Sequence, residues 1–488
     1  MAWGKLSSFC YWALKSPGHR RSDAKRNTSL TTEVKRQVTS FMEEDLLINP
    51  EEGTLGGGTL NKDVQLGRRV SDKLSEGDIT GAVRLLASSS EISPENEETL
   101  TALQQKHPPA PEDLSLPAGP GDDCQPHIAS EEDIRKALSS FRKGSAGGPD
   151  GLRPCHLQSL VSRKASEAGA RLLTTLTGFV NLILRGDVPE FARPVFYGAT
   201  LSALGKKDGG VRPIAVGNTL RRLAVKVGSR PMAASLGESL RPIQLGVSTR
   251  GGCEAAVHAT RRYLGLEGKK VIFKIDMANA FNSLRRDQGD PFGPALFSLA
   301  IDEIARRVDT ELNVWYLDDG TIGDSPEKVF TCLQRLVSDL DDVGLDVNRE
   351  KCELLMLNHT EKESIITRNL FEGLMPGLRV VSVEDSNLLG APLMEKGIPA
   401  AVAEKREDLE RLSSRLRVIE NHQAFALLKN CFALPKLQYI LRASPAYRNN
   451  EDLLLFDRVI ASALSMVTNV KFEGDSLVQA SLPVRFGG

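Results

Sequence analysis

The chain has 488 residues, more than one hydrophobic core usually serves, so we expect several structural units. With 41% hydrophobic and 26% charged residues, the composition is that of a folded protein, and no apolar run approaches the ~20 residues that cross a bilayer, which excludes an integral membrane protein. The seven cysteines contain no CxxC pair, so we predict a reducing, nuclear or cytoplasmic location rather than a secreted, disulfide-linked protein. The net charge is −1, so any polyanionic partner must be recognised by local patches.

The N-terminal part predicts little chemistry. Residues 1–86 are expected to form an irregular or helical extension, with one or two short helices between Val70 and Leu86. The first 27 residues are basic, which is typical of an organellar transit segment, a disordered arm or a misannotated start. Residues 87–129 are acidic and rich in proline, and we interpret them as a linker rather than a core.

A helix start marks the next unit. Ser130 and Asp133 have the spacing of a capping box, apolar residues follow at helical spacing, and Gly144 indicates a stop. We place the main domain boundary just before Ser130. Beyond it strands and helices alternate, which predicts an α+β fold, and after about residue 398 the pattern is nearly all helical. The predicted strands are residues 199–205, 211–216, 271–275, 313–316 and 321–322.

Three carboxylates stand at the ends of these strands. Asp276 ends the apolar strand of VIFKIDMANAF, and Asp318 and Asp319 lie at the tip of the hairpin in VWYLDDGTIG. Acids in such places can project into one cleft and hold two Mg²⁺ ions, which prefer oxygen ligands in fixed geometry. The alternative is an ordinary Asp-Asp-Gly turn with solvated acids.

Several motifs together favour the catalytic interpretation. FKIDMANAF, QGDPFGPALF, YLDD, GLDVNREKCELL and LLGAPL follow one another in the order of the palm motifs of reverse transcriptases, and SAGGPDGL and KKDGGVRPIAVGNTLRRL resemble fingers motifs upstream. The chain resembles the LINE-type (non-LTR) retrotransposon reverse transcriptases most. This resemblance covers about residue 130 to the end.

The resemblance implies a right-hand polymerase with fingers at 130–265, palm at 266–395 and a helical thumb at 396–488. It implies RNA-directed DNA polymerase activity on an RNA template and a DNA primer, with deoxynucleoside triphosphates as substrates and two Mg²⁺ ions, for which Mn²⁺ can substitute. Asp276, Asp318 and Asp319 would hold the metals. No membrane or protein partner is indicated. The nucleotide-binding residues that it implies are Lys206, Arg212, Phe281 (as the block to a ribose 2′-hydroxyl), Gln288, Gly289 and Lys351.

Local charge agrees with this interpretation, although a solvated basic helix face would give the same pattern. Bases outnumber acids between residues 403 and 448, in the implied thumb, and more strongly between residues 201 and 230. A nucleic-acid backbone requires this kind of sequence-independent attraction.

The chain also departs from the family pattern. Only six residues, Asn282 to Asp287, separate Phe281 from Gln288, where family members carry several tens, and Leu317 stands where a small residue is commoner. We therefore expect a truncated copy with an internal deletion between these two palm motifs. The alternative function is a catalytically inactive fragment that at most binds nucleic acid. A telomerase or an intron maturase is a third possibility, which no dedicated RNA-binding domain supports.

Overall fold

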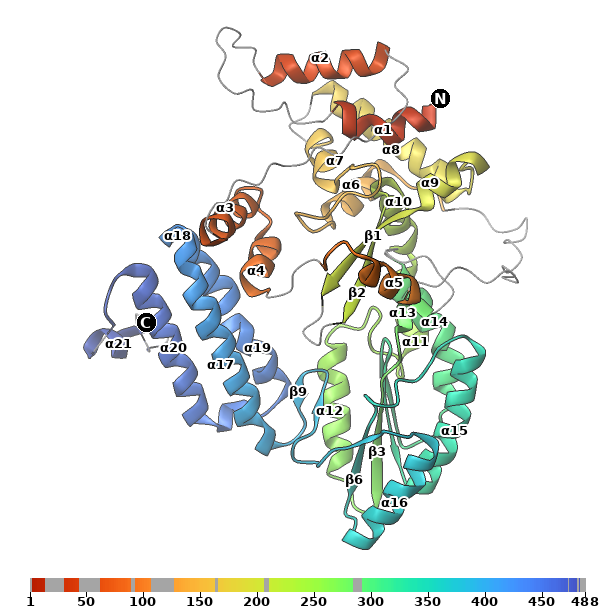
Figure 1. Cartoon of the computed structure of the whole chain (residues 1–488), viewed down its shortest axis with the longest axis vertical. Helices are drawn as coiled ribbons and strands as arrows, with labels where there is room; N and C mark the ends of the chain where they lie inside the picture. Colours follow the sequence, from red (N-terminus) through yellow and green to blue (C-terminus); the bar gives the residue numbers. More distant parts are fainter. Residues whose placement is uncertain are drawn as a thin grey trace.

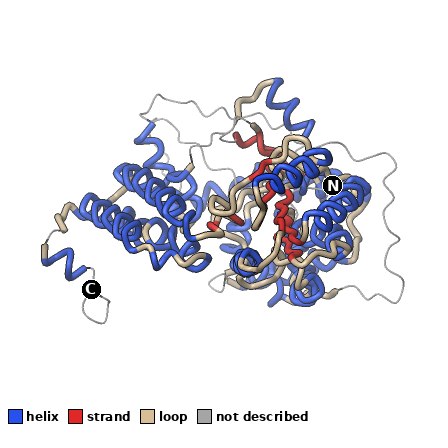
Figure 2. Tube along the Cα trace, turned by 90° about the horizontal axis from the view of Figure 1, so that it is seen from below, coloured by secondary structure: helices blue, strands red, loops and turns tan. Residues whose placement is uncertain are grey.

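The computed structural model describes residues 2–13, 30–43, 62–88, 93–106, 127–162, 166–205, 210–283, 292–472, 474–480 and 482. They form a five-stranded sheet with helices, a helical cluster that carries a two-stranded hairpin, and a set of C-terminal helices (Figures 1 and 2). Among these residues no helix is both long and apolar enough to traverse a bilayer.

The central sheet has the strand order β4-β5-β3-β6-β7. All neighbours are antiparallel except β6 and β7. The middle strand is buried along most of its length, as its Val-Ile-Phe run predicts. The strands are β3 (Lys270–Ile275), β4 (Leu312–Tyr316), β5 (Asp319–Asp324), β6 (Glu353–Leu357) and β7 (Arg379–Val380). The predicted strand at 271–275 and the predicted hairpin at 313–322 are thus confirmed.

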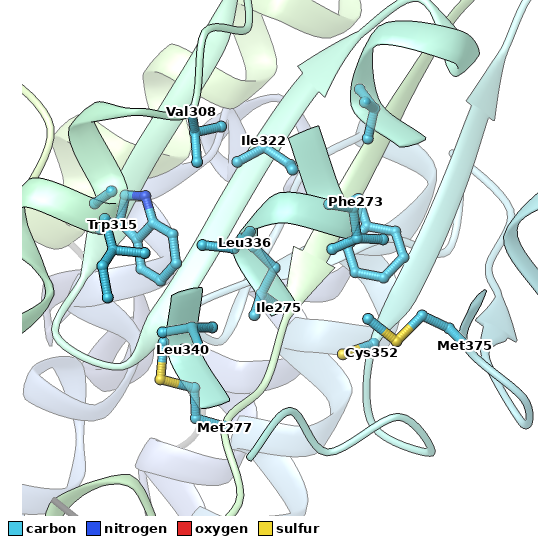
Figure 3. Close-up of a cluster of buried hydrophobic side chains, with 14 of the residues drawn as sticks. Phe273, Ile275, Met277, Val308, Trp315, Ile322, Leu336, Leu340, Cys352 and Met375 are labelled. Carbon is cyan, nitrogen blue, oxygen red and sulfur yellow. The ribbon is translucent and has the colours of Figure 1, made fainter. Parts of the chain in front are cut away.

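One face of the sheet supports the main core. Phe273 and Trp315 are fully buried there, against Phe297, Leu336 and Phe371 from the covering helices (Figure 3). Because side chains alternate along a strand, Ile272 faces the other way, with Tyr263 of α12 (Gly252–Leu264). The covering helices are α14 (Gly293–Arg306), α15 (Pro326–Asp342), which Ser325 caps, and α16 (Glu361–Leu374).

The helical cluster lies between residues 127 and 240. Ser130 and Asp133 form the predicted capping box, at 3.3 and 3.0 Å, although the helix ends at Ser139, before Gly144. The predicted hairpin is confirmed as β1 (Ala199–Gly205) and β2 (Val211–Gly217). The helices are α6 (Glu131–Ser139), α7 (Pro154–Leu160), α8 (Glu167–Leu184), α9 (Arg193–Tyr197), α10 (Thr219–Ser229) and α11 (Met232–Leu240).

Part of the expected basic arm is instead an ordered helix, α1 (Ala2–Ala13). Its Trp3 ring contacts Phe179 and Phe196 of the helical cluster, with centroids 5.4 and 5.5 Å apart, and its Cys10 is buried there. These apolar side chains recur on one face of the helix, so burial outweighs the basic character of the surrounding sequence. Helix α2 (Leu30–Glu43) packs on α1.

The segment interpreted as a linker also contains a helix, α5 (Glu97–Lys106). It packs on β2, where the Lys106 Nζ donates to the Val211 carbonyl (2.6 Å), and the Ser93 amide donates to the Ala203 carbonyl of β1 (3.0 Å). No residue of α5 is buried. The composition therefore predicted correctly that this segment forms no core, but it did not predict the helix.

The C-terminal helices form a separate core, as predicted for a helical region, which two N-terminal helices complete. Helices α3 (Lys62–Ser75) and α4 (Ile79–Ala87) lie beside the C-terminal helices (Figure 1). They place Val70, Ala82 and Leu86 in this core. The C-terminal members are α17 (Ile398–Arg415), α18 (Asn421–Leu427), a π-helical turn (Leu428–Phe432), α19 (Leu434–Ala443) and α20 (Asn450–Thr468). The short helix α21 (Asp475–Ala480) follows them and is exposed where its side chains are described.

We expect Gly67→Ala to destabilise the fold. A Cβ at Gly67 of α3 would overlap the Val418 carbonyl, so α3 would move off the C-terminal helices, at a cost of about 1–3 kcal/mol. Urea unfolding measures this loss. The matched control is Gly178→Ala in the exposed helical position on α8, where nothing lies within 4 Å of the added Cβ and stability should rise by about 0.5–1 kcal/mol. Equal effects of both substitutions would contradict the docking of α3.

The remaining elements connect the sheet to its neighbours. The short helix α13 (Ala280–Ser283) follows β3. The LLGAPL motif at 388–393 lies in a hairpin of β8 (Asn387–Leu388) and β9 (Ala391–Pro392), which packs with α12 and α19.

Candidate active site

The three predicted carboxylates meet at one edge of the central sheet. Asp276 follows β3, Asp318 lies in the turn after β4, and Asp319 is the first residue of β5. Ile275 pairs with Gly320 in the antiparallel ladder, so one step further along places Asp276 opposite Asp319. The local strand and hairpin patterns therefore bring together acids that are far apart in the sequence.

The closeness of these acids changes their electrostatics. Burial raises the pKa of the Asp318 carboxyl, and the charge of Asp276 raises it further. The pKa of Asp319 is raised to about 6, mainly because the carboxyl is partly withdrawn from water, then by Asp318 and Asp276, while Lys274 opposes the shift. The residue as a whole is exposed. Carboxylates that repel one another in this way form a site where binding of a cation is favourable.

The donor set fits a hard divalent cation, because it consists of carboxylate oxygens. In the part of the chain that the structure describes, no group of three or more His, Cys, Asp or Glu side chains has a geometry ready to hold a metal ion. The structure brings three acidic side chains and their charge together at this place.

The loop before β6 supports Asp276. The Asn348 amide donates to the Asp276 carbonyl (2.8 Å), and the Asp276 amide donates to the Cys352 Sγ (3.5 Å). A neighbouring bond runs from the Ala278 amide to the Asp346 carbonyl (2.8 Å). Lys351 is an exposed residue of this same loop, so its backbone lies next to the strand end. Its predicted part in nucleotide binding stays a prediction.

Phe281 lies on α13, one turn beyond Asp276. Its ring contacts Phe297 of α14, with centroids 4.8 Å apart and an interplanar angle of 42°, and 36% of the residue is exposed. The contact fixes one side of the ring while the rest remains accessible. Such an arrangement is compatible with the predicted sugar contact, which stays a prediction.

Of the other predicted nucleotide-binding residues, the structure describes Arg212. Arg212 is exposed on β2, opposite Leu204, in a sheet separate from the central one. Lys206, Gln288 and Gly289 lie outside the described residues.

The side chain of one β3 residue connects this strand to the β8–β9 hairpin. Lys274, two residues before Asp276, forms an ion pair with Glu353 of β6 and donates to the Asn387 carbonyl (2.7 Å). Because residues two apart on a strand share a face, this lysine connects the carboxylate side of the sheet to the hairpin.

Gln244 is a residue of the site that sequence reasoning missed. Only 1% of it is exposed, and its amide group bonds the backbone of Leu317, directly before Asp318. The sole local signal is a polar residue amid the apolar neighbours of PIQLGV. Its partner is 73 residues away, so no local pattern could identify the contact.

Residues 285–390 match a family model described as reverse transcriptase (RNA-dependent DNA polymerase). The match contains Asp318, Asp319 and Lys351 and begins after Asp276, which reaches the site through the pairing of β3 with β5. No curated protein matches the chain. The function class that this match supports is a reverse-transcriptase-like polymerase, with its reverse transcriptase domain at residues 285–390.

Proposed function

We propose that the chain is an RNA-directed DNA polymerase of LINE-type retrotransposon origin, which adds deoxynucleotides to a primer. The observation that carries this proposal is the meeting of Asp276 with Asp318 and Asp319 at the edge of the central sheet, two of them inside the matched segment. In this proposal the sheet is the palm, the helical cluster with β1–β2 the fingers, and the helices from residue 396 the thumb.

The carboxylates would hold two Mg²⁺ ions, and Mn²⁺ has the same preference for oxygen ligands. Bound there, the ions would lower the pKa of a primer 3′-hydroxyl and neutralise charge on the triphosphate and the leaving pyrophosphate. The carboxylates' own task is to keep their oxygens aimed at one point, which the pairing of β3 with β5 supports.

The other proposed roles follow from position and chemistry. Phe281 would lie under the sugar of the incoming nucleotide, with Phe297 behind it. Arg212 of β2 and Lys206, which follows β1 in the sequence, would attract the triphosphate, together with Lys351. Gln288 and Gly289 would lie against the nucleotide and the template. The β8–β9 hairpin, connected to β3 by Lys274, would support the primer end.

The decisive experiment is primer extension on an RNA template by the purified full chain. We expect extension with Mg²⁺ and deoxynucleotides, slower or less selective extension with Mn²⁺, and complete loss when EDTA removes the metal, with recovery after Mg²⁺ is restored. Extension that persists in excess EDTA would contradict the metal assignment.

The short junction after Phe281 favours a second candidate, a copy with an internal deletion that binds nucleic acid without catalysis. Salt-dependent binding of a primer–template duplex, with no extension by folded protein in Mg²⁺ or Mn²⁺, would support this second function instead.

A further inference from the structure

A short segment outside the central sheet follows the outer edge of β4. The Trp315 amide donates to the Ile243 carbonyl (2.8 Å), and the Leu245 amide donates to the Trp315 carbonyl (2.7 Å). Gln244 and Trp315 thus form a parallel bridge, through which the backbone near Gln244 lies along the outer edge of β4. This bridge places the Gln244 side chain at the turn that follows β4.

Both ends of the Gln244 amide bond the turn. Its Oε1 accepts from the Leu317 amide (2.7 Å) and from the Gly246 amide (2.9 Å), and its Nε2 donates to the Leu317 carbonyl (3.1 Å). Of the common side chains at this length, only a glutamine supplies an acceptor and a donor without a charge. The two bonds to Leu317 therefore hold both its backbone N–H and its backbone C=O.

The turn requires such support. Leu317 has φ +57°, a left-handed conformation that costs energy for a residue with a Cβ. Asp318 is the next residue, so rotation at Leu317 would swing its carboxylate away from Asp276. Hydrogen bonds to both the N–H and the C=O of Leu317 resist that rotation.

Gly246 completes the contact. A Cβ on this residue would lie 2.6 Å from the Leu317 amide nitrogen and 2.7 Å from its Cγ. The close approach of the two backbones at this point therefore depends on a glycine.

We propose that Gln244 is a positioning residue for the carboxylate site, and that it sets the affinity for divalent cations by holding the Leu317–Asp318 turn. This inference rests on the proposed function, because it assumes that Asp318 and Asp319 bind metal. Gln244 touches neither metal nor nucleotide in this role. The alternative is that its amide only satisfies buried backbone groups, as polar side chains in a core must.

The test uses Gln244→Met, which keeps the length of the side chain and removes the three bonds. Mn²⁺ binding to the full chain is measured by titration calorimetry without nucleic acid, and primer extension is measured against Mg²⁺ concentration. We expect about tenfold weaker Mn²⁺ binding, within the range that lost outer-shell contacts usually cause. The Mg²⁺ concentration for half-maximal extension should rise by a similar factor, while the rate at saturating Mg²⁺ largely recovers.

The matched control is Gln158→Met. Gln158 Nε2 also donates to a backbone carbonyl, that of Leu138 (2.6 Å), but within the helical cluster. This variant loses a comparable bond and should bind Mn²⁺ as the wild type does. Weakening by both variants would indicate a general loss of structure and overturn the proposal.

Gly246→Ala provides a second, independent variant if Gln244→Met does not fold, and it should weaken Mn²⁺ binding in the same way. Wild-type affinity in both folded variants would overturn the role of Gln244 and leave the proposed function intact. If Asp318→Asn binds Mn²⁺ as tightly as the wild type, the metal assignment fails, and the inference fails with it.

Discussion

Asp318→Asn should abolish primer extension, with a loss of at least about 10³-fold, which corresponds to roughly 4 kcal/mol of transition-state stabilisation. The substitution keeps the shape of the side chain but removes a negatively charged ligand at the tip of the β4–β5 hairpin. Binding of a primer–template duplex should change little, because Asp318 is proposed to hold metal and makes no phosphate contact. Extension rates and duplex affinity, measured on the same preparation, check both expectations.

The control for this variant is its stability without metal. Burial and the charge of Asp276 raise the pKa of Asp318 above its usual value, so at neutral pH its ionised form opposes folding. This penalty is fully present above the raised pKa. It shrinks as the pH falls from there to the ordinary pKa of an aspartate, below which the carboxyl is protonated in both the folded and the unfolded chain. The uncharged asparagine removes it, so the Tm of the metal-free variant should equal or exceed that of the wild type. A lower Tm would attribute lost activity to unfolding.

Phe281→Ala should change sugar selection by about 10²-fold, the size of effect expected when a steric block at a binding pocket is removed. The ring is held on one side by Phe297 and is otherwise accessible, so it can meet a ribose 2′-hydroxyl without yielding. The truncated side chain leaves space for that hydroxyl. Competing incorporation of a ribonucleotide and the matching deoxynucleotide, each at several concentrations, gives the ratio of their kcat/KM values.

A control for Phe281→Ala is Phe297→Leu, which removes the ring that supports Phe281 but keeps an apolar side chain in the core. It should relax selection less than Phe281→Ala while lowering stability more, because Phe297 is buried and Phe281 is not. Unchanged selection in Phe281→Ala, with extension intact, would remove Phe281 as the sugar-contacting residue.

Local patterns predicted the parts of the site whose structure is local. The Val-Ile-Phe run gave β3, and the turn at Asp318 gave the β4–β5 hairpin, because alternation and turn chemistry act over a few residues. The capping box at Ser130 was recognisable for the same reason. Asp276 and Asp319 become neighbours only because β3 pairs with β5, a contact between distant segments that these local patterns do not specify.

Other features depend on contacts between distant segments. The docking of α1 rests on Trp3 and two aromatic residues more than 170 positions away, while its surroundings resemble a basic arm. Helix α5 buries none of its residues, so composition alone indicated a linker. The hydrogen bonds between Gln244 and Leu317 likewise join segments 73 residues apart, so no short stretch of sequence predicts them. In each case tertiary packing decides the structure, and a single sequence carries no signal for the partner.

The packing of α3 and α4 on the C-terminal helices has a consequence for biosynthesis. Ser71 donates to the Gln423 side chain across 352 positions, and Arg415 donates to the Leu86 carbonyl across 329. Almost the whole chain must therefore leave the ribosome before Val70 and Leu86 are covered. Closing a loop of this length is slow. Until it closes, the apolar side chains of Val70 and Leu86 are exposed and can contact other chains. A chaperone that binds nascent chains would protect this stretch, and a version begun at Ser130 would leave the matching surface of α17 bare.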